Sequence, residues 1–158
     1  MEVDLRTFPE AGSPVIGIVV LNVGANNLQN CIVLGVERQS GGTNRFYSFV
    51  IVSNATQAEL FGSTLTNGIY KVAITYKQND FALYVNGTSI ATDNSGNVPA
   101  CSEVLIGSRF NTDTRFLNSH IRAAAIYTTR LSNATLESMT SLSQSYAELA
   151  SSFSYTVI

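Results

Sequence analysis

Alternation of apolar and polar positions is clearest in the middle of the chain. The segment 69–76 (IYKVAITY) changes side at every residue and is rich in β-branched and aromatic residues, which predicts a strand. Segments 81–85 and 88–92 follow with the same period. Asn86-Gly87 between them is the dipeptide that best fits a type I′ hairpin turn, because both of its residues need positive φ. The pattern therefore predicts an antiparallel meander of three strands.

Apolar runs elsewhere predict further short strands, separated by turn-forming clusters as in a sandwich or barrel. The runs cover residues 3–5, 15–23, 31–36, 45–52, 102–110 and 121–127, and the clusters cover residues 9–14, 24–30, 39–44 and 53–57. Residues 121–127 are apolar at nearly every position, which predicts a strand buried on both faces. Together these runs predict an all-β fold, a two-sheet antiparallel β-sandwich.

A short helix is predicted after residue 131. Leu136, Met139 and Leu142 recur at helical spacing, and Ser132 is the preferred N-cap, with Asn133 as the alternative. Residues 143–150 form a second helical candidate. The alternating residues 153–157 fit either a final strand that pairs with the first or an exposed tail.

Composition narrows the functional classes. A length of 158 residues fits one domain with a substantial core, a fragment or terminal domain of a longer chain. Charged residues make up 13% of the chain, about half the usual share. The net charge of −2 and the lack of a basic stripe argue against nucleic acid as a partner. Since no apolar run approaches the roughly 20 residues that span a bilayer, no membrane insertion is expected. Cys31 fits a small core residue, and a disulfide with Cys101 is left open.

Three blocks carry a resemblance to a known family. They are residues 70–96 (YKVAITYKQNDFALYVNGTSIATDNSG), 102–110 (SEVLIGSRF) and 117–142 (LNSHIRAAAIYTTRLSNATLESMTSL). Together they resemble the concanavalin A-like lectin/glucanase superfamily in its laminin-G-like form. More narrowly, they look like the version at the ends of bacteriophage tail fibres and tailspikes, where N-G/S-H-I-R leads into an apolar strand, a tyrosine, and Arg-Leu-Ser-Asn before a helix. Here these are residues 118–122, Tyr127 and residues 130–133.

The resemblance implies a jelly-roll β-sandwich and a role in binding carbohydrate or a receptor. It also implies a place on the exposed surface of a virion, at a phage tail, a setting that fold analogy alone does not establish. The expected partner is a bacterial surface polysaccharide or another host receptor, and the expected assembly is a homotrimer. The alternative is a structural domain that stabilises a trimer or decorates the virion without its own ligand. The absence of tryptophan, the aromatic residue most often stacked on sugars, favours that alternative.

Catalysis is not expected. Glucanases of the superfamily use two carboxylates on one strand, but here no two acidic residues fall within five positions on a predicted strand. The scattered carboxylates are Glu37, Glu59, Asp80, Asp93, Glu103 and Asp113. His120 is the only histidine, no Ser or Cys motif accompanies it, and a hydrogen-bonded role at a strand start is expected. A glycan hydrolase is therefore the least favoured function.

Two segments combine planar polar side chains with aromatic rings, the pattern that binds sugars. The first is the loop 109–116 (RFNTDTRF), whose candidate ligands are Arg109, Asn111, Asp113, Arg115 and Phe116. The second surrounds a Gly-Gly turn, with candidates Arg38, Arg45 and Tyr47. Both also fit solvated loops with anchoring aromatic residues.

No cofactor is required, but the resemblance allows a Ca²⁺ ion bound by loop carboxylates and carbonyls. The candidate ligands are Asp93, Asn94 and Asp113. Asp and Asn also form turns by bonding to their own main chain, and that interpretation is favoured.

Overall fold

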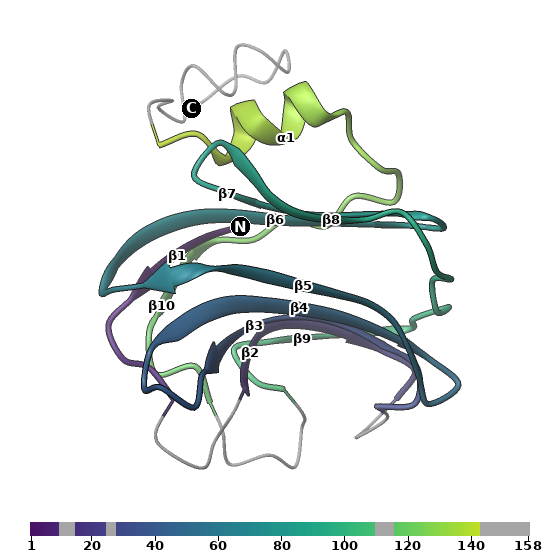
Figure 1. Ribbon diagram of the computed structural model, residues 1–158, viewed down its shortest axis with the longest axis horizontal. Helices are drawn as coiled ribbons and strands as arrows, with labels where there is room; N and C mark the ends of the chain where they lie inside the picture. The colour runs from purple at the N-terminus through teal and green to yellow at the C-terminus, as the bar shows by residue number, and fades with distance from the viewer. Residues whose placement is uncertain (10–14, 25–27, 110–115, 143–158) are drawn as a thin grey trace.

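The computed structural model describes residues 1–9, 15–24, 28–109 and 116–142, and its strands form two stacked layers (Figure 1). Each layer is a five-stranded antiparallel sheet. Sheet A has the order β10-β1-β6-β7-β8, with β10 (His120–Ala123), β1 (Glu2–Leu5), β6 (Gly68–Lys77), β7 (Asp80–Val85) and β8 (Thr88–Asp93). Sheet B has the order β5-β4-β3-β2-β9, with β5 (Ala55–Leu65), β4 (Asn44–Val52), β3 (Cys31–Arg38), β2 (Val15–Asn22) and β9 (Glu103–Ile106). The predicted all-β sandwich is confirmed.

Apolar side chains from the facing sides of the two sheets form the main core. On β3, Ile32, Leu34 and Val36 point between the sheets and are almost fully buried, and Val3 and Leu5 of β1 meet them from sheet A. Each such side chain contributes about 1.5–3 kcal/mol when it is fully buried. The period-2 pattern of the sequence therefore fixes which face of each strand turns inward.

The predicted meander is confirmed, since β6, β7 and β8 are consecutive neighbours in sheet A. Asn86 and Gly87 both have positive φ, 50° and 85°, as the type I′ turn between β7 and β8 requires. The turn between β6 and β7 is tighter than the predicted cluster 77–80, because Lys77 and Asp80 already pair across it.

Strand β5 is not predicted by the sequence pattern. The cluster 53–57 is expected to be a turn, but only Ser53 and Asn54 turn the chain, both with positive φ, and β5 begins at Ala55. β5 lies at the edge of sheet B, and most of its residues are at least partly exposed. Few large apolar residues therefore mark its inward positions. The alternation is weak because the outer face of β5 carries the large apolar Phe61 as well as polar residues such as Glu59.

The predicted buried strand at 121–127 is wrong in length and in burial. β10 spans only His120–Ala123, and residues 124–129 are exposed without regular structure. β10 pairs with β1 alone, and the register runs from Asp4↔His120 to Glu2↔Ala123. Residues 124–127 therefore lie past the last β1 residue that could continue the ladder.

Helix α1 (Asn133–Thr140) packs on the outer side of sheet A (Figure 1). Ser132 is its N-cap, since its Oγ accepts a hydrogen bond from the N–H of Thr135 at 3.1 Å. The preferred cap is therefore correct. Leu136 is buried against Ala82 and Tyr84, which anchors the helix to β7. The candidates at 143–150 and 153–157 lie outside the described residues.

Neither cysteine is in a disulfide. Cys31 is buried, as predicted for a small core residue, and Cys101 is partly buried. Burial raises the pKa of the Cys31 thiol to about 12. No helix within the described residues combines the length and the apolar character that crossing a membrane requires.

Candidate functional site

The two segments with sugar-binding patterns are only partly described. Asn111, Asp113 and Arg115 lie outside the described residues. The base of their loop is closed by a bridge between Ser108 and Phe116 and by a hydrogen bond from the Leu117 N–H to the Gly107 carbonyl at 2.7 Å. The loop 109–116 therefore leaves the end of β9 and returns to the same edge of sheet B.

The second segment divides between two faces. Arg45 and Tyr47 lie at alternate positions of β4 and point to the outer side of sheet B. Arg38 lies two residues after the inward-pointing Val36 of β3, so it is on the other side of sheet B from Arg45 and Tyr47. Its Nη1 donates to the carbonyl oxygen of Pro9 at 3.1 Å. The structure therefore brings Arg45 and Tyr47 together, whereas Arg38 holds the chain after β1 and does not join them.

Tyr47 lies at the centre of an aromatic cluster on this outer side. Its ring stacks on Phe61 with centroids 5.0 Å apart and an interplanar angle of 5°, because Tyr47 and Phe61 are direct cross-strand partners. Phe49, two residues along β4, lies 5.2 Å from Tyr47 between centroids. The guanidinium of Arg45 sits 3.9 Å above the centroid of Phe61, a cation–π contact. Phe61 is 38% exposed, so solvent reaches one end of the stack.

Carboxylates complete the cluster. Arg45 Nε donates to Glu37 Oε2 at 2.8 Å, and the hydroxyl of Tyr47 donates to Glu59 Oε1. Burial raises the pKa of Tyr47, and the hydrogen bond to Glu59 raises it further, so the phenol stays protonated at neutral pH. We refer to these six residues as the aromatic face, namely Glu37, Arg45, Tyr47, Phe49, Glu59 and Phe61.

Two glycines lie in the same cross-strand row of sheet B as Tyr47 and Phe61. Gly17, Gly35, Tyr47 and Phe61 are successive cross-strand partners on β2, β3, β4 and β5. A Cβ at Gly17 would lie 2.8 Å from the Cα of Arg109, so the start of the loop 109–116 rests directly on this row. Arg109, the first residue of that loop, therefore lies over β2, two strands from Tyr47 on β4.

In Figure 1 the strands of sheet B bend away from sheet A at both ends, so this outer side is concave. A concave, aromatic surface with fixed hydrogen-bonding groups is suited to a planar ligand that offers both apolar and hydroxyl surface. Sequence reasoning misses Glu37, Phe49, Glu59 and Phe61. The alternation along β4 could have predicted Phe49, which lies two residues after Tyr47 and faces the same side. Glu59 and Phe61 could be predicted only if β5 were recognised as the neighbour of β4.

The calcium candidates are not brought together in the described part of the chain. Asp93 Oδ1 accepts hydrogen bonds from the N–H and the hydroxyl of Ser95, both at 3.0 Å, which is an Asx turn. Asp113 is not described. No group of three or more His, Cys, Asp or Glu side chains that could hold a metal ion occurs among the described residues.

Carboxylates of the aromatic face are already engaged by neighbouring side chains. Glu37 accepts a hydrogen bond from Arg45, and Glu59 accepts one from the hydroxyl of Tyr47. A glycosidase needs one carboxyl group that protonates the leaving oxygen and a second that acts as base or nucleophile. His120 is exposed at the start of β10, on the other sheet.

Comparison with known families gives one match that covers most of the chain. A profile described as the concanavalin A-like lectin/glucanases superfamily (Laminin_G_3) matches residues 12–137, well over half of the chain. No curated protein and no solved structure shows significant similarity to the chain. The match covers most of both sheets, the aromatic face and the start of α1. The chain therefore belongs to the concanavalin A-like lectin/glucanase superfamily.

Proposed function

We propose that this domain binds carbohydrate without cleaving it, and that the aromatic face of sheet B is the binding surface. The stacked Tyr47–Phe61 pair is the observation that carries the proposal. A sugar ring has an apolar side that packs on aromatic rings, and hydroxyl groups at its edge that need hydrogen-bond partners. Both kinds of partner lie together here, since Arg45 lies over the ring of Phe61 and Glu59 accepts a hydrogen bond from the hydroxyl of Tyr47.

Prior ordering of the polar groups favours binding. Arg45 and Glu37 are already paired, with side chains 23% and 20% exposed. Because the pair is held before a ligand arrives, less side-chain entropy is lost on binding than at a flexible surface. Arg45 also presents a planar set of donors that matches two adjacent sugar hydroxyls.

Membership of a lectin/glucanase superfamily is compatible with binding or with hydrolysis. The engagement of Glu37 by Arg45 and of Glu59 by Tyr47 favours binding. Incubating the chain with a polysaccharide that it binds, and assaying released reducing ends, tests this point. Release that disappears in Glu37→Gln or Glu59→Gln would show that the domain is an enzyme.

For the biological setting we propose the receptor-binding end of a bacteriophage tail fibre or tailspike, which recognises host surface polysaccharide as a homotrimer. The motif at residues 118–133 motivates this setting. Fluorescently labelled protein should adsorb to a permissive bacterial host, and light scattering should give three times the chain mass of 17.0 kDa. A monomer that adsorbs to no host would contradict the setting.

Binding itself is best tested on a panel of bacterial polysaccharides. Wild type should bind at least one glycan, and Tyr47→Phe should keep the ring stack but lose the hydroxyl that bonds Glu59. We expect Tyr47→Phe to weaken binding by about three- to tenfold, since one hydrogen bond contributes about 0.5–1.5 kcal/mol. If no glycan binds and the protein is a stable trimer, the structural alternative, a trimer-stabilising or decoration domain, replaces this proposal.

A further inference from the structure

Three charged side chains surround the Tyr47–Phe61 stack of the aromatic face. Glu37 lies opposite Arg45 across β3 and β4, and Glu59 accepts a hydrogen bond from the Tyr47 hydroxyl. All three act on that hydroxyl. Burial is the main cause of the raised pKa of the Tyr47 phenol, Glu59 and Glu37 raise it further, and Arg45 lowers it. Two negative charges and one positive charge therefore lie around the stack.

The one cation of the aromatic face is already neutralised. Arg45 Nε donates to Glu37 Oε2 at 2.8 Å, and both side chains are largely withdrawn from solvent. An anion could reach Arg45 only by displacing Glu37 or by lying beside it. Glu59 is exposed, and its partner is the uncharged hydroxyl of Tyr47. The uncompensated charge of the aromatic face is therefore negative and belongs to Glu59.

Hydrogen-bonding capacity of the same groups matches sugar hydroxyls. A carboxylate only accepts hydrogen bonds and has about four lone-pair sites, of which the bonds to Arg45 and Tyr47 use one each at Glu37 and Glu59. A guanidinium only donates, and a hydroxyl both donates and accepts. Sugar hydroxyls can therefore satisfy either kind of group. A ligand carboxylate or phosphate offers acceptors alone, and it would meet the two glutamates without a hydrogen to share.

Arg109 places its charge away from the stack. It lies over β2 at Gly17, two strands from Tyr47. Its charge acts on the thiol of Cys31, where it opposes the rise in pKa that burial causes. Cys31 begins β3, whereas Glu37 lies near the other end of that strand. The described end of the loop 109–116 therefore does not offset the charge of Glu59.

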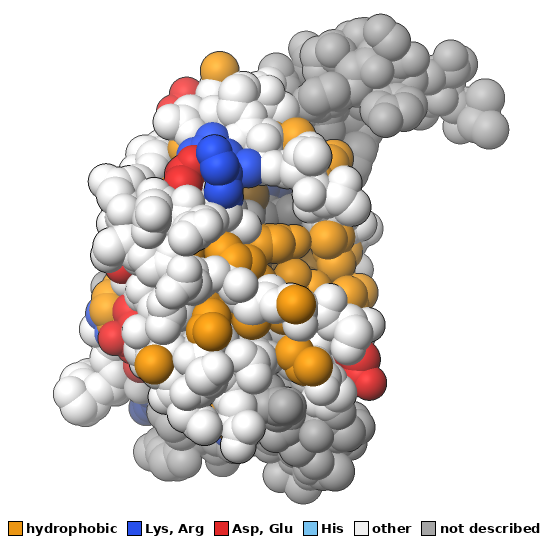
Figure 2. Space-filling model, turned by 90° about the vertical axis from the view of Figure 1, so that its right-hand side faces the viewer, with side chains coloured by type: hydrophobic (Ala, Val, Ile, Leu, Met, Phe, Trp, Pro, Cys, Tyr) orange, Lys and Arg blue, Asp and Glu red, His pale blue; other side chains and the backbone are white. Residues whose placement is uncertain are grey.

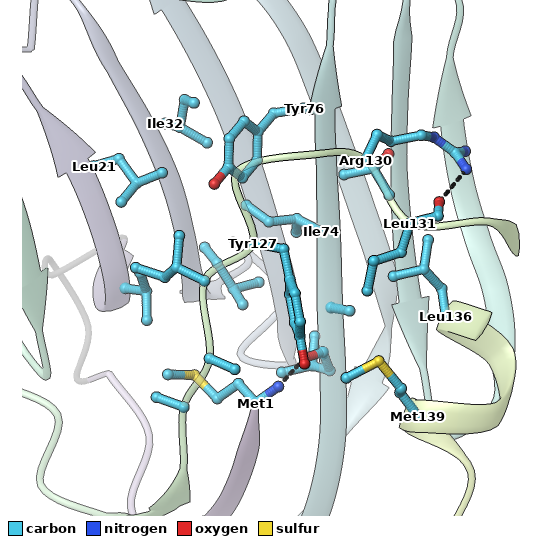
Figure 3. A pocket seen from close by; sticks show the side chains of 18 of the residues that line it. Met1, Leu21, Ile32, Ile74, Tyr76, Tyr127, Arg130, Leu131, Leu136 and Met139 are labelled. Carbon is cyan, nitrogen blue, oxygen red and sulfur yellow. Dashed lines mark hydrogen bonds between the residues drawn. The ribbon is translucent and has the colours of Figure 1, made fainter. Parts of the chain in front are cut away.

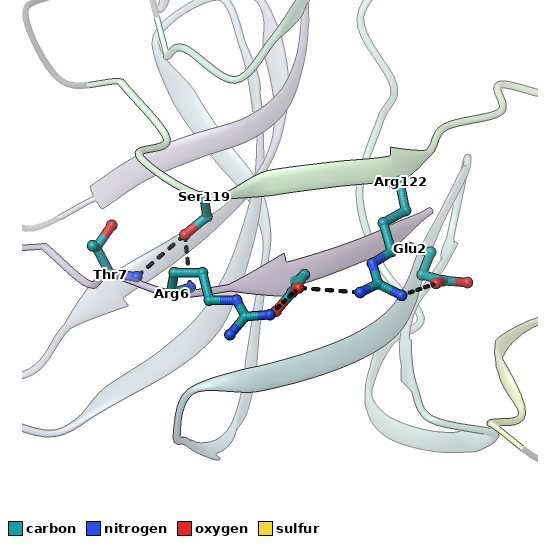
Figure 4. Close-up of polar contacts among 6 residues, drawn as sticks. Glu2, Arg6, Thr7, Ser119 and Arg122 are labelled. Carbon is teal, nitrogen blue, oxygen red and sulfur yellow. Dashed lines mark hydrogen bonds and ion pairs between the residues drawn. The ribbon is translucent and has the colours of Figure 1, made fainter.

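Arginines at the β1–β10 edge of sheet A are also paired with carboxylates (Figure 4). Arg122 lies 3.2 Å from Asp4 and 3.7 Å from Glu2. Arg6 lies 2.6 Å from Asp4. These pairs join β1 to β10 and to the residues that follow β1. An acidic sugar at this edge would have to compete with carboxylates that the fold already supplies.

The hollow in the side of the molecule is largely apolar. Figure 2 shows hydrophobic side chains gathered between the two layers, around a cavity of about 170 Å³. Figure 3 shows Tyr127 within it, beside Ile74. Arg130 is the one charged side chain in the described lining, and its Nη2 donates to Asp80 Oδ1 at 3.0 Å. Since buried sugar hydroxyls need hydrogen-bond partners, the aromatic face suits a glycan better than this hollow does.

We propose that the aromatic face selects neutral glycans over acidic glycans, which carry carboxylate, sulfate or phosphate groups. The proposal rests on carbohydrate binding by this face and adds the chemical class of the sugar. Glu59 repels a second negative charge, and Glu37 keeps Arg45 from acting as an anion clamp. The expected preference is at least about fivefold, which corresponds to about 1 kcal/mol, the repulsion of two unit charges about 4 Å apart in water.

Matched glycan pairs test this selection. A panel of bacterial polysaccharides is immobilised twice, once as isolated and once after chemical reduction of its carboxyl groups to primary alcohols. The reduction turns each acidic sugar residue into the corresponding neutral one and keeps the linkages. The protein should bind the reduced member of a pair at least about fivefold more tightly than the acidic member. Added salt should narrow the difference, because it screens exposed charges.

Glu59→Gln tests which charge is responsible. Glutamine keeps an acceptor oxygen for the Tyr47 hydroxyl and removes the charge. The variant should reduce the preference for the neutral member by about fivefold, through tighter binding of the acidic member. Glu137→Gln is the matched control, because it makes the same change in net charge at an exposed position of α1, over sheet A. The control should leave the preference unchanged.

The possible results separate this selection from carbohydrate binding itself. Tighter binding of acidic members that is lost in Phe61→Ala would overturn the selection for neutral glycans and would keep the aromatic face as the glycan site. Equal binding of both members of the pairs, or equal effects of Glu59→Gln and Glu137→Gln, would also overturn it. Binding to no member of any pair would contradict carbohydrate binding, and the selection with it.

Discussion

The two sheets of this sandwich offer opposite kinds of surface. Sheet B is continuous from β5 to β9, and its distinctive chemistry lies in side chains on its outer side, centred on Tyr47 and Phe61. Sheet A is partly covered by the chain's own residues, since Leu136 of α1 packs on Ala82 and Tyr84, and Arg122 of β10 pairs with Asp4 of β1. Sheet B therefore presents ordered side chains to solvent, whereas sheet A uses much of its surface for contacts within the domain.

This difference favours sheet B as the layer that recognises a ligand. Aromatic rings with fixed polar groups suit a sugar, which has an apolar side and hydroxyl groups. Variants on sheet A should therefore leave glycan binding intact, and this separation can be tested.

The largest effect is expected at Gly35, in the row of partners that leads to Tyr47. A Cβ there would lie 2.5 Å from the backbone oxygen of Ile16, so β2 and β3 would have to move apart. Gly35→Ala should lower the free energy of unfolding by about 2–3 kcal/mol, the upper range for overpacking. Urea unfolding measures this, and Gly41→Ala is the matched control because no atom lies within 4 Å of its Cβ.

Glycan binding by Gly35→Ala should fall with the distortion of sheet B. Equal stability of the Gly35 and Gly41 variants would show that the row tolerates a side chain.

A second variant compares two exposed aromatic residues. Phe61 of the aromatic face is 38% exposed, and Tyr127 in the segment after β10 is 46% exposed. Phe61→Ala removes the ring that stacks on Tyr47 and carries Arg45, so glycan affinity should fall at least about tenfold, or about 1.4 kcal/mol. Tyr127→Ala should leave glycan affinity unchanged. Isothermal titration of both variants with the bound glycan measures the difference, and equal losses would remove the distinction between the two surfaces.

The third variant concerns α1, which packs on β7 of sheet A. Ser132→Ala removes the acceptor for the Thr135 N–H and should cost about 1 kcal/mol. Thermal unfolding should show this loss, with Asn133→Ala as the control because Asn133 is the alternative cap in the sequence and lies inside the helix. If Asn133→Ala were the more damaging change, the assignment of the cap would be wrong.

The smallest effect is a change in pH dependence at the β1–β10 edge of sheet A. A hydrogen bond from Arg6 and the charges of Arg6 and Arg122 lower the pKa of Asp4 from its ordinary value of 3.8. A lowered folded-state pKa contributes stability that is present above the unfolded value and is lost as pH falls through the folded value. Asp4→Asn should therefore lose less stability than wild type when urea unfolding is compared at about pH 6 and about pH 2.5, a range that brackets the ordinary value for Asp.

Arg6→Gln should change the pH dependence in the same direction as Asp4→Asn, because it removes the first cause of the shift. An unchanged slope in both variants would mean that Asp4 does not contribute acid sensitivity.

Local chemistry explains why most of the fold is predictable. Asn86-Gly87 specifies its turn from two residues, and the alternation in β6 and β7 specifies which side is inward. Ser132 specifies the start of α1 in the same local way. These features need no knowledge of neighbours in space, so a single sequence contains them.

Non-local pairing explains what the sequence does not predict. β5 has few large apolar residues, and its place beside β4 depends on the turn at Ser53 and Asn54. The apolar pattern at 121–127 predicts a central strand, but its continuation past Ala123 needs a neighbour that the described part of β1 does not supply. The candidate site shows the same division, since Arg45 and Tyr47 are close in sequence whereas Phe61 joins them only across the sheet.

The most direct test of carbohydrate binding is a titration of the ¹⁵N-labelled chain with the glycan that it binds, followed residue by residue by NMR. The account predicts that the amide signals of Arg45, Tyr47 and Phe61 shift together in a saturable way, while those of Ile74 and Tyr76 stay in place. Shifts confined to β6 and residues 124–131, or no saturable shift with any glycan, would contradict the assignment of the aromatic face.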